Sequence, residues 1–257
     1  MSESLAMAVA AEDSADAPRC MLGVENSVLG RRWVSRDPAA DRLGLAIAQA
    51  HGLPEVVGRV LAARGVPLEE AGAYLAATLR ELMPKPASLK DMDAAAARLA
   101  AAVRNKERIA VFGDYDVDGA TSAALLARFL RENGIEPQIH IPDRITEGYG
   151  PNEQAISALK DAGASLLVTV DCGSTSHDAL SHAGAIGLEV LVIDHHQIGV
   201  DLPPAISVVN PNRQDDLSGL GYLAAVGVVF MTVIATARIL RQRGWYQGDQ
   251  REPDLLE

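Results

Sequence analysis

The sequence predicts an α/β protein in which an open, mainly parallel sheet has helices on both faces and follows a small helical region. Two observations lead to this prediction. Short, continuous apolar runs recur from residue 109 onward, and about one helix length of sequence separates each run from the next. Continuous runs rich in β-branched residues are typical of strands buried on both faces, and their alternation with helices indicates right-handed parallel crossovers.

The first part of the chain lacks such runs. Residues 1–30 carry 1 basic and 5 acidic side chains among small residues, and we expect a disordered acidic tail there. Residues 31–106 contain amphipathic segments, most of them interrupted by Gly or Pro, at 41–52, 54–65, 67–81 and 91–107. These segments predict a helical N-terminal region over residues 31–106.

Residues 107–257 are expected to form the sheet domain. Strands are predicted at 109–113, 137–141, 165–170 and 189–193, and a shorter one at 205–210. Intervening segments such as 120–133 and 152–163 have helical patterns. Residues 223–244 form a long apolar segment that is too apolar for a surface helix, so we expect it to pack against the sheet or another part of the protein.

Composition restricts the class of protein. The two cysteines, Cys20 and Cys172, are far apart, which fits a reducing cytoplasm rather than a disulfide framework. No uninterrupted apolar run reaches the ~18–20 residues that cross a bilayer, so no membrane association is expected. The net charge of −11 disfavours a nucleic-acid partner. However, residues 31–110 carry 13 basic and 9 acidic side chains, so a polyanionic substrate is compatible with the charge distribution.

Acidic and imidazole side chains follow three of the predicted strands. In a parallel sheet the carboxyl ends of the strands meet at one edge, so these side chains should converge. A single aspartate after a strand is often only a helix N-cap, but several packed carboxylates repel one another unless cations lie between them. Carboxylates with a minority of imidazoles suit Mn²⁺ or Mg²⁺, and two such ions are the usual apparatus for displacement at phosphorus. The residues concerned are Asp114, Asp116, Asp118, Asp171, Asp194, His195 and His196.

Two neighbouring residues have alternative explanations. Gly119 opens a predicted helix, where its backbone N–H can meet a phosphate oxygen or where it can be a simple turn glycine. Cys172 adjoins Asp171, but no third group is placed to activate it, so we interpret it as a packing residue. The remaining histidines lie outside the motifs and are interpreted as surface or packing residues: His51, His140, His177 and His182.

Three segments carry a resemblance to a known family. GDYDVDGATSAALL, VTVDCG and VIDHHQ resemble the successive motifs of the DHH phosphoesterase family in order and spacing. Further segments resemble the RecJ exonucleases within that family: RRWV, LKDMDAAAARL, PDRITEGYGPN, VVNPNR and LAAVGVVF. The likeness covers residues 31–257.

The resemblance implies roles for the motif residues. Asp116 and Asp118 match metal ligands, and Asp114 matches an additional acidic position. Asp171 matches a carboxylate that bridges two ions, and His195 matches a metal-binding imidazole with Asp194 in support. His196 matches a residue near the scissile phosphate, although a purely structural histidine is the alternative. The implied catalytic set is Asp116, Asp118, Asp171, His195 and His196.

The resemblance also implies an activity. RecJ-like enzymes are metal-dependent exonucleases that hydrolyse phosphodiester bonds of single-stranded DNA, 5′ to 3′, in DNA repair and recombination. The implied cofactor is Mn²⁺ or Mg²⁺ at a two-metal site, and the implied partners of a monomeric enzyme are single-stranded DNA, a single-stranded-DNA-binding protein and a helicase. We expect Arg144, Tyr149 and Arg213 to hold the DNA strand, because Arg pairs with phosphate and Tyr stacks on bases. Alternatively, Arg144 pairs with Glu147 and Tyr149 belongs to a structural turn.

The sequence departs from the RecJ-like enzymes in one respect, and two alternative functions remain compatible with it. RecJ-like enzymes carry a further metal-binding aspartate, a DHH-associated domain and an OB-type domain downstream, so the chain is expected to be a truncated catalytic core with doubtful activity. The first alternative function is a DHH-family phosphodiesterase or pyrophosphatase that acts on small phosphates or oligonucleotides. The second is a non-catalytic DNA-binding or scaffold protein with the same fold.

Overall fold

The structure is a computed structural model that describes residues 20–34, 37–248 and 250–255 of the chain. By their internal contacts the residues divide into two compact units, Met1–Met83 and Pro84–Glu257. Each unit has its own elements and its own core.

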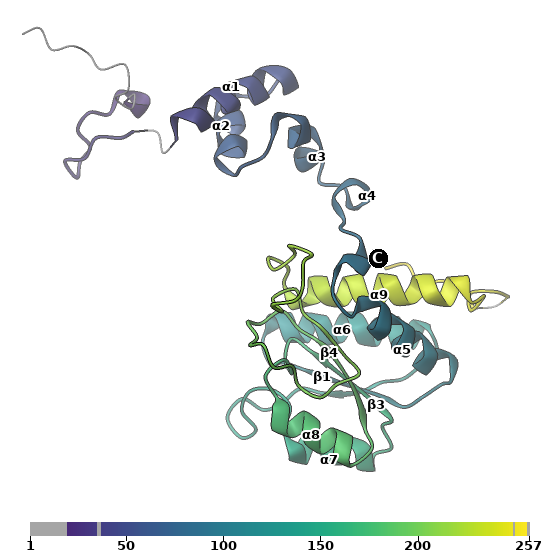
Figure 1. Cartoon of the computed structure of the whole chain (residues 1–257). Coiled ribbons are helices and arrows are strands. Elements are labelled where there is room, and N and C mark those ends of the chain that lie inside the picture. The colour runs from purple at the N-terminus through teal and green to yellow at the C-terminus, as the bar shows by residue number, and fades with distance from the viewer. Residues whose placement is uncertain (1–19, 35–36, 249, 256–257) are drawn as a thin grey trace, which may run out of the picture. The chain divides into compact units, whose positions relative to one another are not determined.

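The first unit is helical. A 3₁₀ turn η1 (Met21–Gly23) lies beside an isolated antiparallel bridge between Cys20 and Val34. Helix packing is tight, because a Cβ atom on Gly58 would lie 2.1 Å from the carbonyl oxygen of Gly44. The elements after η1 are α1 (Pro38–His51), α2 (Glu55–Ala63), η2 (Leu68–Glu70), α3 (Ala71–Ala76) and α4 (Leu79–Leu82) (Figure 1).

The second unit is an α/β domain in which helices alternate with strands, as the sequence predicts. Its helices are η3 (Pro86–Ser88), α5 (Met92–Arg104), α6 (Val117–Glu132), α7 (Glu153–Asp161), α8 (His177–Ala185) and α9 (Ala225–Gln242). Its strands are β1 (Ile109–Gly113), β2 (Gln138–His140), β3 (Leu166–Val170), β4 (Glu189–Ile193) and β5 (Ser207–Val209).

All five strands pair in parallel, in the order β2-β1-β3-β4-β5. From β1 the chain runs outward to β2 and then crosses to β3 on the other side. The strand order therefore reverses between β1 and β3. In open α/β sheets ligands bind in the crevice at the carboxyl ends of the strands at such a reversal.

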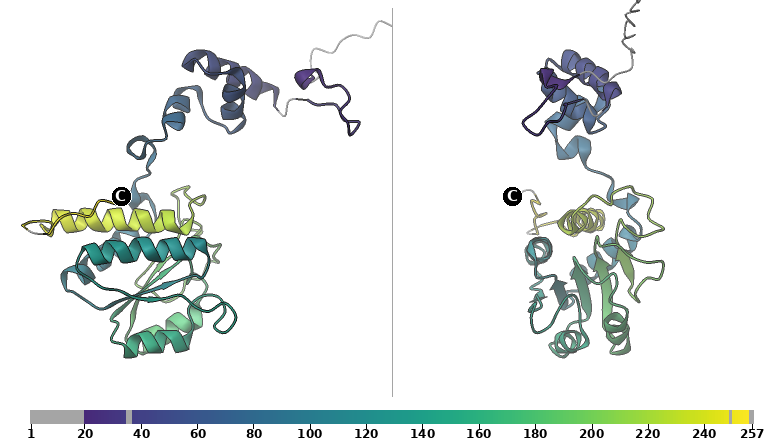
Figure 2. Two further views of the ribbon diagram at one scale, coloured as in Figure 1. Left: turned by 180° about the vertical axis from the view of Figure 1, so that it is seen from behind. Right: turned by 90° about the vertical axis from the view of Figure 1, so that its left-hand side faces the viewer.

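Helices cover both faces of the sheet, which confirms the predicted fold class. Figures 1 and 2 show α5, α6 and α9 over one face and α7 and α8 over the other. Alternate strand residues serve the two layers: Ala110 and Phe112 belong to the core under α7 and α8, which also includes Leu167 and Val190. Every residue of β1 and β3 is buried, as continuous apolar runs require.

Helix α9 is the most apolar long helix of this unit. Among the described residues it is the helix whose length and composition would also suit a membrane span, and 56% of that 18-residue window is buried. It packs against α5 and α6 and contacts β4. The predicted burial of residues 223–244 against the sheet layer is thus observed.

Two predicted boundaries differ from the structure. The expected domain boundary lay between residues 106 and 107, but the two units meet between Met83 and Pro84 because α5 packs on α9 and β5. A disordered tail was expected through residue 30, yet η1 and the bridge at Cys20 give structure to residues 20–30. The rest of the expected tail, residues 1–19, lies outside the described residues.

Candidate metal centre

Three aspartates stand side by side at the carboxyl edge of the sheet. The strand ends Gly113, Val170 and Ile193 are aligned in register. The next residue on each strand is an aspartate: Asp114, Asp171 and Asp194. The hydrogen bonding between the strands extends to these aspartates. The N–H of Asp114 donates to the carbonyl oxygen of Val170, and the N–H of Asp171 donates to that of Ile193. Parallel pairing therefore brings together carboxylates that lie far apart in the sequence.

Asp171 is the centre of this row. Its side chain is 1% exposed, and neither carboxylate oxygen has a hydrogen-bond partner among the described residues. Burial, reinforced by the negative charges of Asp118 and Asp116, raises the pKa of Asp171 to about 8. Its backbone adopts a left-handed conformation with φ of 60°, which is uncommon outside glycine. Asp171 thus combines a strained backbone with an unsatisfied buried carboxyl group.

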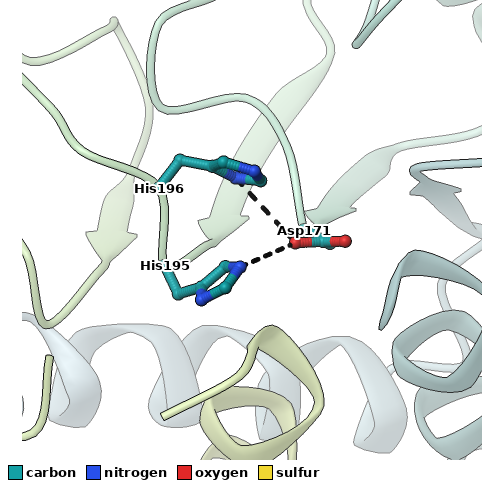
Figure 3. Close-up of side chains that lie close together, drawn as sticks. All are labelled: Asp171, His195 and His196. Atoms are coloured by element: carbon teal, nitrogen blue, oxygen red, sulfur yellow. Dashed lines mark ion pairs between the residues drawn. The ribbon is translucent and has the colours of Figure 1, made fainter. Parts of the chain in front are cut away.

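His195 faces Asp171 with a defined ring nitrogen. Its Nδ1 lies 3.0 Å from the carbonyl oxygen of Leu223, which can only accept, so Nδ1 carries the proton of this bond. The other nitrogen, Nε2, lies 3.3 Å from Oδ1 of Asp171 (Figure 3). It also lies 3.6 Å from Oδ2 of Asp118. Such a bond on the far nitrogen is how proteins orient a histidine toward a metal ion.

His196 lies beside His195, with the two ring centres 4.9 Å apart, and approaches the same oxygen of Asp171. Its Nδ1 is 2.8 Å from Oδ1 of Asp194 and 3.8 Å from Oδ1 of Asp171 (Figure 3). The hydrogen bond to Asp194 raises the pKa of His196 to about 9, against the opposing effect of burial. His196 is exposed, so at neutral pH it presents a cation to solvent beside the aspartates.

Asp194 was expected among the metal ligands and as a support for His195, and its observed contacts are those of a supporting residue. Its Oδ1 accepts hydrogen bonds from the backbone N–H groups of His195 and His196 and from the ring Nδ1–H of His196. Its Oδ2 accepts from the N–H of Ser174. Burial acts to raise the pKa of Asp194, but these hydrogen bonds outweigh it and lower the pKa to about 2. Because its oxygens are engaged, Asp194 orients the histidines.

The loop after β1 contributes two more acids with structural roles. Asp116 is the N-cap of α6, and its Oδ1 accepts from the N–H groups of Asp118 and Gly119. Those bonds lower the pKa of Asp116. Asp118 caps a different helix: its Oδ2 and Oδ1 accept from the first N–H groups of α9, Ala225 at 2.7 Å and Val226 at 2.9 Å. Asp118 therefore joins α6, α9 and the edge of the site.

Two groups of side chains are close enough to hold an ion. In each group the potential ligand atoms lie within 4.8 Å of one another, and Asp171 belongs to both. The groups are Asp114, Asp116 and Asp171, and Asp171, His195 and His196. A divalent cation fits this set, because it would satisfy the buried oxygens of Asp171 and offset the packed negative charge. Carboxylate and imidazole donors without thiolate suit Mn²⁺ or Mg²⁺.

Aromatic side chains form a rim beside the acids. The hydroxyl of Tyr149 donates to the carbonyl oxygen of Asp171 at 3.3 Å, and its ring lies edge-on to His196. Tyr115 lies edge-on to Tyr149, and the guanidinium of Arg144 stacks 5.0 Å from the centre of the Tyr115 ring. Arg144 and Tyr149 are exposed. The rim therefore offers a cation and aromatic faces next to the acidic centre.

Two residues predicted to contact the substrate have other functions. Arg213 is buried, and its guanidinium donates to Asp91, Asp215 and the carbonyl oxygen of Val208 at the outer edge of β5. Its guanidinium is therefore engaged by partners within the protein. The N–H of Gly119 is bound by Asp116 rather than free for a phosphate. A Cβ atom there would lie 2.4 Å from the carbonyl oxygen of Asp114, so glycine allows α6 to approach β1.

Sequence reasoning missed four polar residues of the site. Ser174 and Asn210 are buried between the loops that carry Asp171 and the histidines, and Asn212 contacts the carbonyl oxygen of His195. Tyr115 forms part of the rim. A signal existed for Asn210, because it follows a predicted strand as the aspartates do, but an uncharged amide does not suggest metal chemistry.

Comparison with known proteins gives the family. The DHH family, N-terminal domain, matches residues 108–254, more than half of the chain and all the strands described above. The chain belongs to the DHH family. Among its relatives is the single-stranded-DNA-specific exonuclease RecJ of Bacillus subtilis, 35% identical over 199 residues, which are 77% of this chain and 25% of that protein. RecJ of Salmonella typhimurium is 37% identical over 209 residues, which are 80% of this chain and 35% of that protein.

Solved structures of the DHH family agree with the fold. RecJ from Thermus thermophilus in complex with Mn²⁺ is similar with a TM-score of 0.62 and 30% identity, over 81% of this chain and 28% of that chain. An exonuclease RecJ bound to manganese gives a TM-score of 0.55 and 39% identity, over 59% of this chain and 38% of that chain. The chain thus spans 25% and 35% of the length of the two curated relatives above.

Proposed function

We propose that this chain carries the metal-binding part of a single-stranded-DNA-specific exonuclease that hydrolyses phosphodiester bonds with Mn²⁺ or Mg²⁺. The observation that carries the proposal is Asp171. A buried carboxyl group without a hydrogen-bond partner among the described residues, shared by two groups of potential ligands, calls for a cation. The RecJ relatives supply the substrate class and the metals.

The proposed ligands are the side chains that lie around the carboxylate of Asp171: Asp114, Asp116, Asp118, Asp171 and His195. Ions bound there would lower the pKa of a water molecule and offset negative charge on the phosphate oxygens. His196 contributes a fixed positive charge beside them, held by Asp194 at 2.8 Å. We assign His196 to a phosphate oxygen of the substrate, because its charge is exposed and its orientation is set from behind.

The rim supports a single strand as the substrate. Tyr115 and Tyr149 offer aromatic faces, and Arg144 offers a guanidinium, within one cluster next to the aspartates. Stacking and phosphate pairing hold single strands without reading their sequence. Because the strand would lie beside an acidic centre, we expect binding to depend on the divalent cation and to weaken as salt concentration rises.

The direct test is hydrolysis by the chain as it stands. Because the chain spans only part of its relatives' length, we expect slow release of nucleotides from a long single strand with Mn²⁺, while the matching duplex should resist. Asp171→Asn should abolish release, and Asp161→Asn, an exposed acid at the end of α7, should leave it unchanged. Release from a dinucleotide or pyrophosphate but not from the long strand would instead support a small-phosphate hydrolase. Metal binding without hydrolysis of any of these substrates would support a non-catalytic relative.

Wider aspects of the function are part of the same proposal. We infer a role in DNA repair and recombination in the cytoplasm, 5′-to-3′ digestion, and cooperation of a monomeric enzyme with a single-stranded-DNA-binding protein and a helicase. These aspects rest on the motif resemblance; the RecJ relatives support only the single-stranded DNA substrate, and the unpaired Cys20 and Cys172 fit a reducing compartment. In a longer protein, a DHH-associated and an OB-type domain would complete the binding channel.

A further inference from the structure

A fourth polar residue stands in the row at the carboxyl edge of the sheet. Strand β5 pairs with β4 so that Val209 is aligned with Ile193. Asn210 therefore follows β5 at the level at which Asp194 follows β4, and the N–H of Asp194 donates to Val209. Asn210 is 0% exposed. It differs from the aspartates of the row in that its amide can donate hydrogen bonds as well as accept them.

The amide of Asn210 connects two loops. Its Nδ2 donates to Oγ of Ser174 and to the carbonyl oxygen of His196, both at 2.9 Å. Its Oδ1 accepts from the backbone N–H of Asn212 at 2.8 Å. Ser174 lies three residues after Asp171, so a single buried amide holds the loop of the central carboxylate against the loop of the histidines.

Asn212 completes the contact on the other histidine. Its side-chain amide donates a short hydrogen bond to the carbonyl oxygen of His195. Gly221 leaves the space for this amide, since a Cβ atom there would lie 2.6 Å from Oδ1 of Asn212. The position of the Asn212 amide therefore depends on its hydrogen bond to His195 and on the space that glycine leaves at position 221.

The asparagines and Asp194 hold the histidine loop from both sides. Asp194 binds the backbone N–H groups of His195 and His196, while Asn212 and Asn210 bind their carbonyl oxygens. Ser174 closes the arrangement, because its N–H donates to Asp194 and its Oγ accepts from Asn210. The backbone polar groups of both histidines are thus satisfied by side chains rather than by a helix or sheet ladder.

We infer that Asn210 and Asn212 are positioning residues for the metal centre, which set the place of His195 and His196 relative to Asp171. The inference rests on the proposed metal-binding function. Neither asparagine offers an atom to the crevice groups; both act through the histidine backbone. Metal affinity depends on ligand positions held to within about 0.5 Å, and partners behind the ligands typically contribute about 10–100-fold. Simple fold stabilisation would not single out metal affinity in this way.

The test measures Mn²⁺ binding by the wild-type chain and by the variants Asn210→Ala and Asn212→Ala. Electron paramagnetic resonance reports both the amount of bound ion and its environment. We expect about 10–100-fold weaker binding in each variant and an altered spectrum of the ion that remains bound. Asn133→Ala is the matched control. Asn133 is also buried and also makes two side-chain hydrogen bonds, to Phe129 and Trp245, but these lie at the far end of α6. It should bind Mn²⁺ like the wild type, even if it unfolds at a lower temperature.

A second pair of variants leaves both asparagines in place. Gly221→Ala should displace the Asn212 amide and weaken Mn²⁺ binding in the same direction. Gly199→Ala, where a Cβ atom meets nothing within 4 Å, should not. Should Asn210→Ala fail to fold, Asn212→Ala and Gly221→Ala decide the matter, because Asn212 is only partly buried.

The outcomes separate the inference from the function on which it rests. No Mn²⁺ binding by the wild-type chain would overturn the metal centre and the inference with it. Wild-type binding together with unchanged affinity in folded Asn212→Ala and Gly221→Ala would overturn the inference alone. An equal loss in Asn133→Ala would also overturn it, because the effect would then follow general stability.

Discussion

The carboxylate of Asp118 lies 3.6 Å from Nε2 of His195 and at the same time caps the N-terminus of α9 with both of its oxygens. One side chain therefore serves the candidate metal centre and a helix that begins 107 residues later in the chain. The helix itself has no capping side chain at Ala224. Asp118 is thus the residue through which the metal centre and the packing of α9 are connected.

Replacing Asp118 should affect both features. In the metal-free protein Asp118→Ala should lower the free energy of unfolding by about 1 kcal/mol, the usual cost of losing a helix cap. It should also weaken Mn²⁺ binding. Urea unfolding and Mn²⁺ titration of the same preparation measure the two effects. Asp178→Ala, which removes an exposed acid from the first turn of α8, is the control and should change neither markedly.

Replacing Asp171 should separate metal binding from folding. At a Mn²⁺ concentration of a hundred times Kd the wild-type chain should gain about 2.7 kcal/mol of stability by mass action. Asp171→Asn should lose most of that gain, because the substitution removes the charge shared by both ligand groups. Thermal unfolding with and without Mn²⁺ provides the measurement, with Asp161→Asn beside it. A full Mn²⁺-dependent gain in Asp171→Asn would contradict the central role of this carboxylate.

The two arginines predicted to hold DNA should behave in opposite ways. Arg144→Ala should weaken retention of a single strand and leave stability unchanged, since the side chain is exposed and rests on Tyr115. Arg213→Ala should lower stability by about 1–3 kcal/mol, because it leaves the buried carbonyl oxygen of Val208 unsatisfied. Filter binding of a labelled strand and chemical unfolding distinguish the two effects. If Arg144→Ala and Arg213→Ala lost DNA binding equally while both were fully folded, the two arginines would not have the different roles proposed here.

A partly buried ion pair away from the metal centre gives a pH-dependent prediction. Arg98 donates to Glu107 and to Glu189 of β4. Burial acts to raise the pKa of Glu107, but the hydrogen bonds and charge of Arg98 outweigh it and lower the pKa below its ordinary 4.5. A carboxylate with a lowered pKa in the folded state stabilises the fold above that ordinary value, and this stabilisation is lost as pH falls through the folded pKa.

Glu107→Gln should therefore be less stable than the wild type at pH 7, by about 2 kcal/mol for the lost charge-assisted bonds. The difference should shrink as pH falls below the ordinary 4.5. Unfolding curves from about pH 3 to about pH 8 span the titration of the carboxylate and provide the measurement. Glu136→Gln, which removes the partner of Arg131 in a surface ion pair, should change stability little at any pH. A pH-independent difference in Glu107→Gln would show that packing rather than charge is lost.

Much of the fold was predictable because its signals are local. Continuous runs such as 109–113 and 165–170 are short and rich in β-branched residues, which favours buried strands. Parallel pairing of these strands then places Asp114, Asp171 and Asp194 at one edge. The roles of single residues were less predictable. Nothing in the type of Arg213 distinguishes a buried ion pair from a contact with DNA, since both use the same guanidinium.

Other features depend on pairings that local sequence does not encode. Asp118 meets α9 across 107 positions of chain, and Asn210 meets Ser174 across 36. The domain boundary was misplaced for the same reason, because the Ala-rich pattern of α5 shows that it is a helix but not which unit it joins. Asp194 was predicted both as a ligand and as a support for His195, and its hydrogen bonds match the supporting role.

Asp171 breaks several rules of stable folding at once: a positive φ outside glycine, a buried ionisable group and oxygens left without partners among the described residues. Mutational screens that reward heat resistance in the absence of divalent ions should therefore discard this aspartate early and accept glycine or asparagine in its place. Screens that reward turnover should keep it against that pressure. The residue found at position 171 after such a screen would then show whether the protein was selected for stability or for turnover.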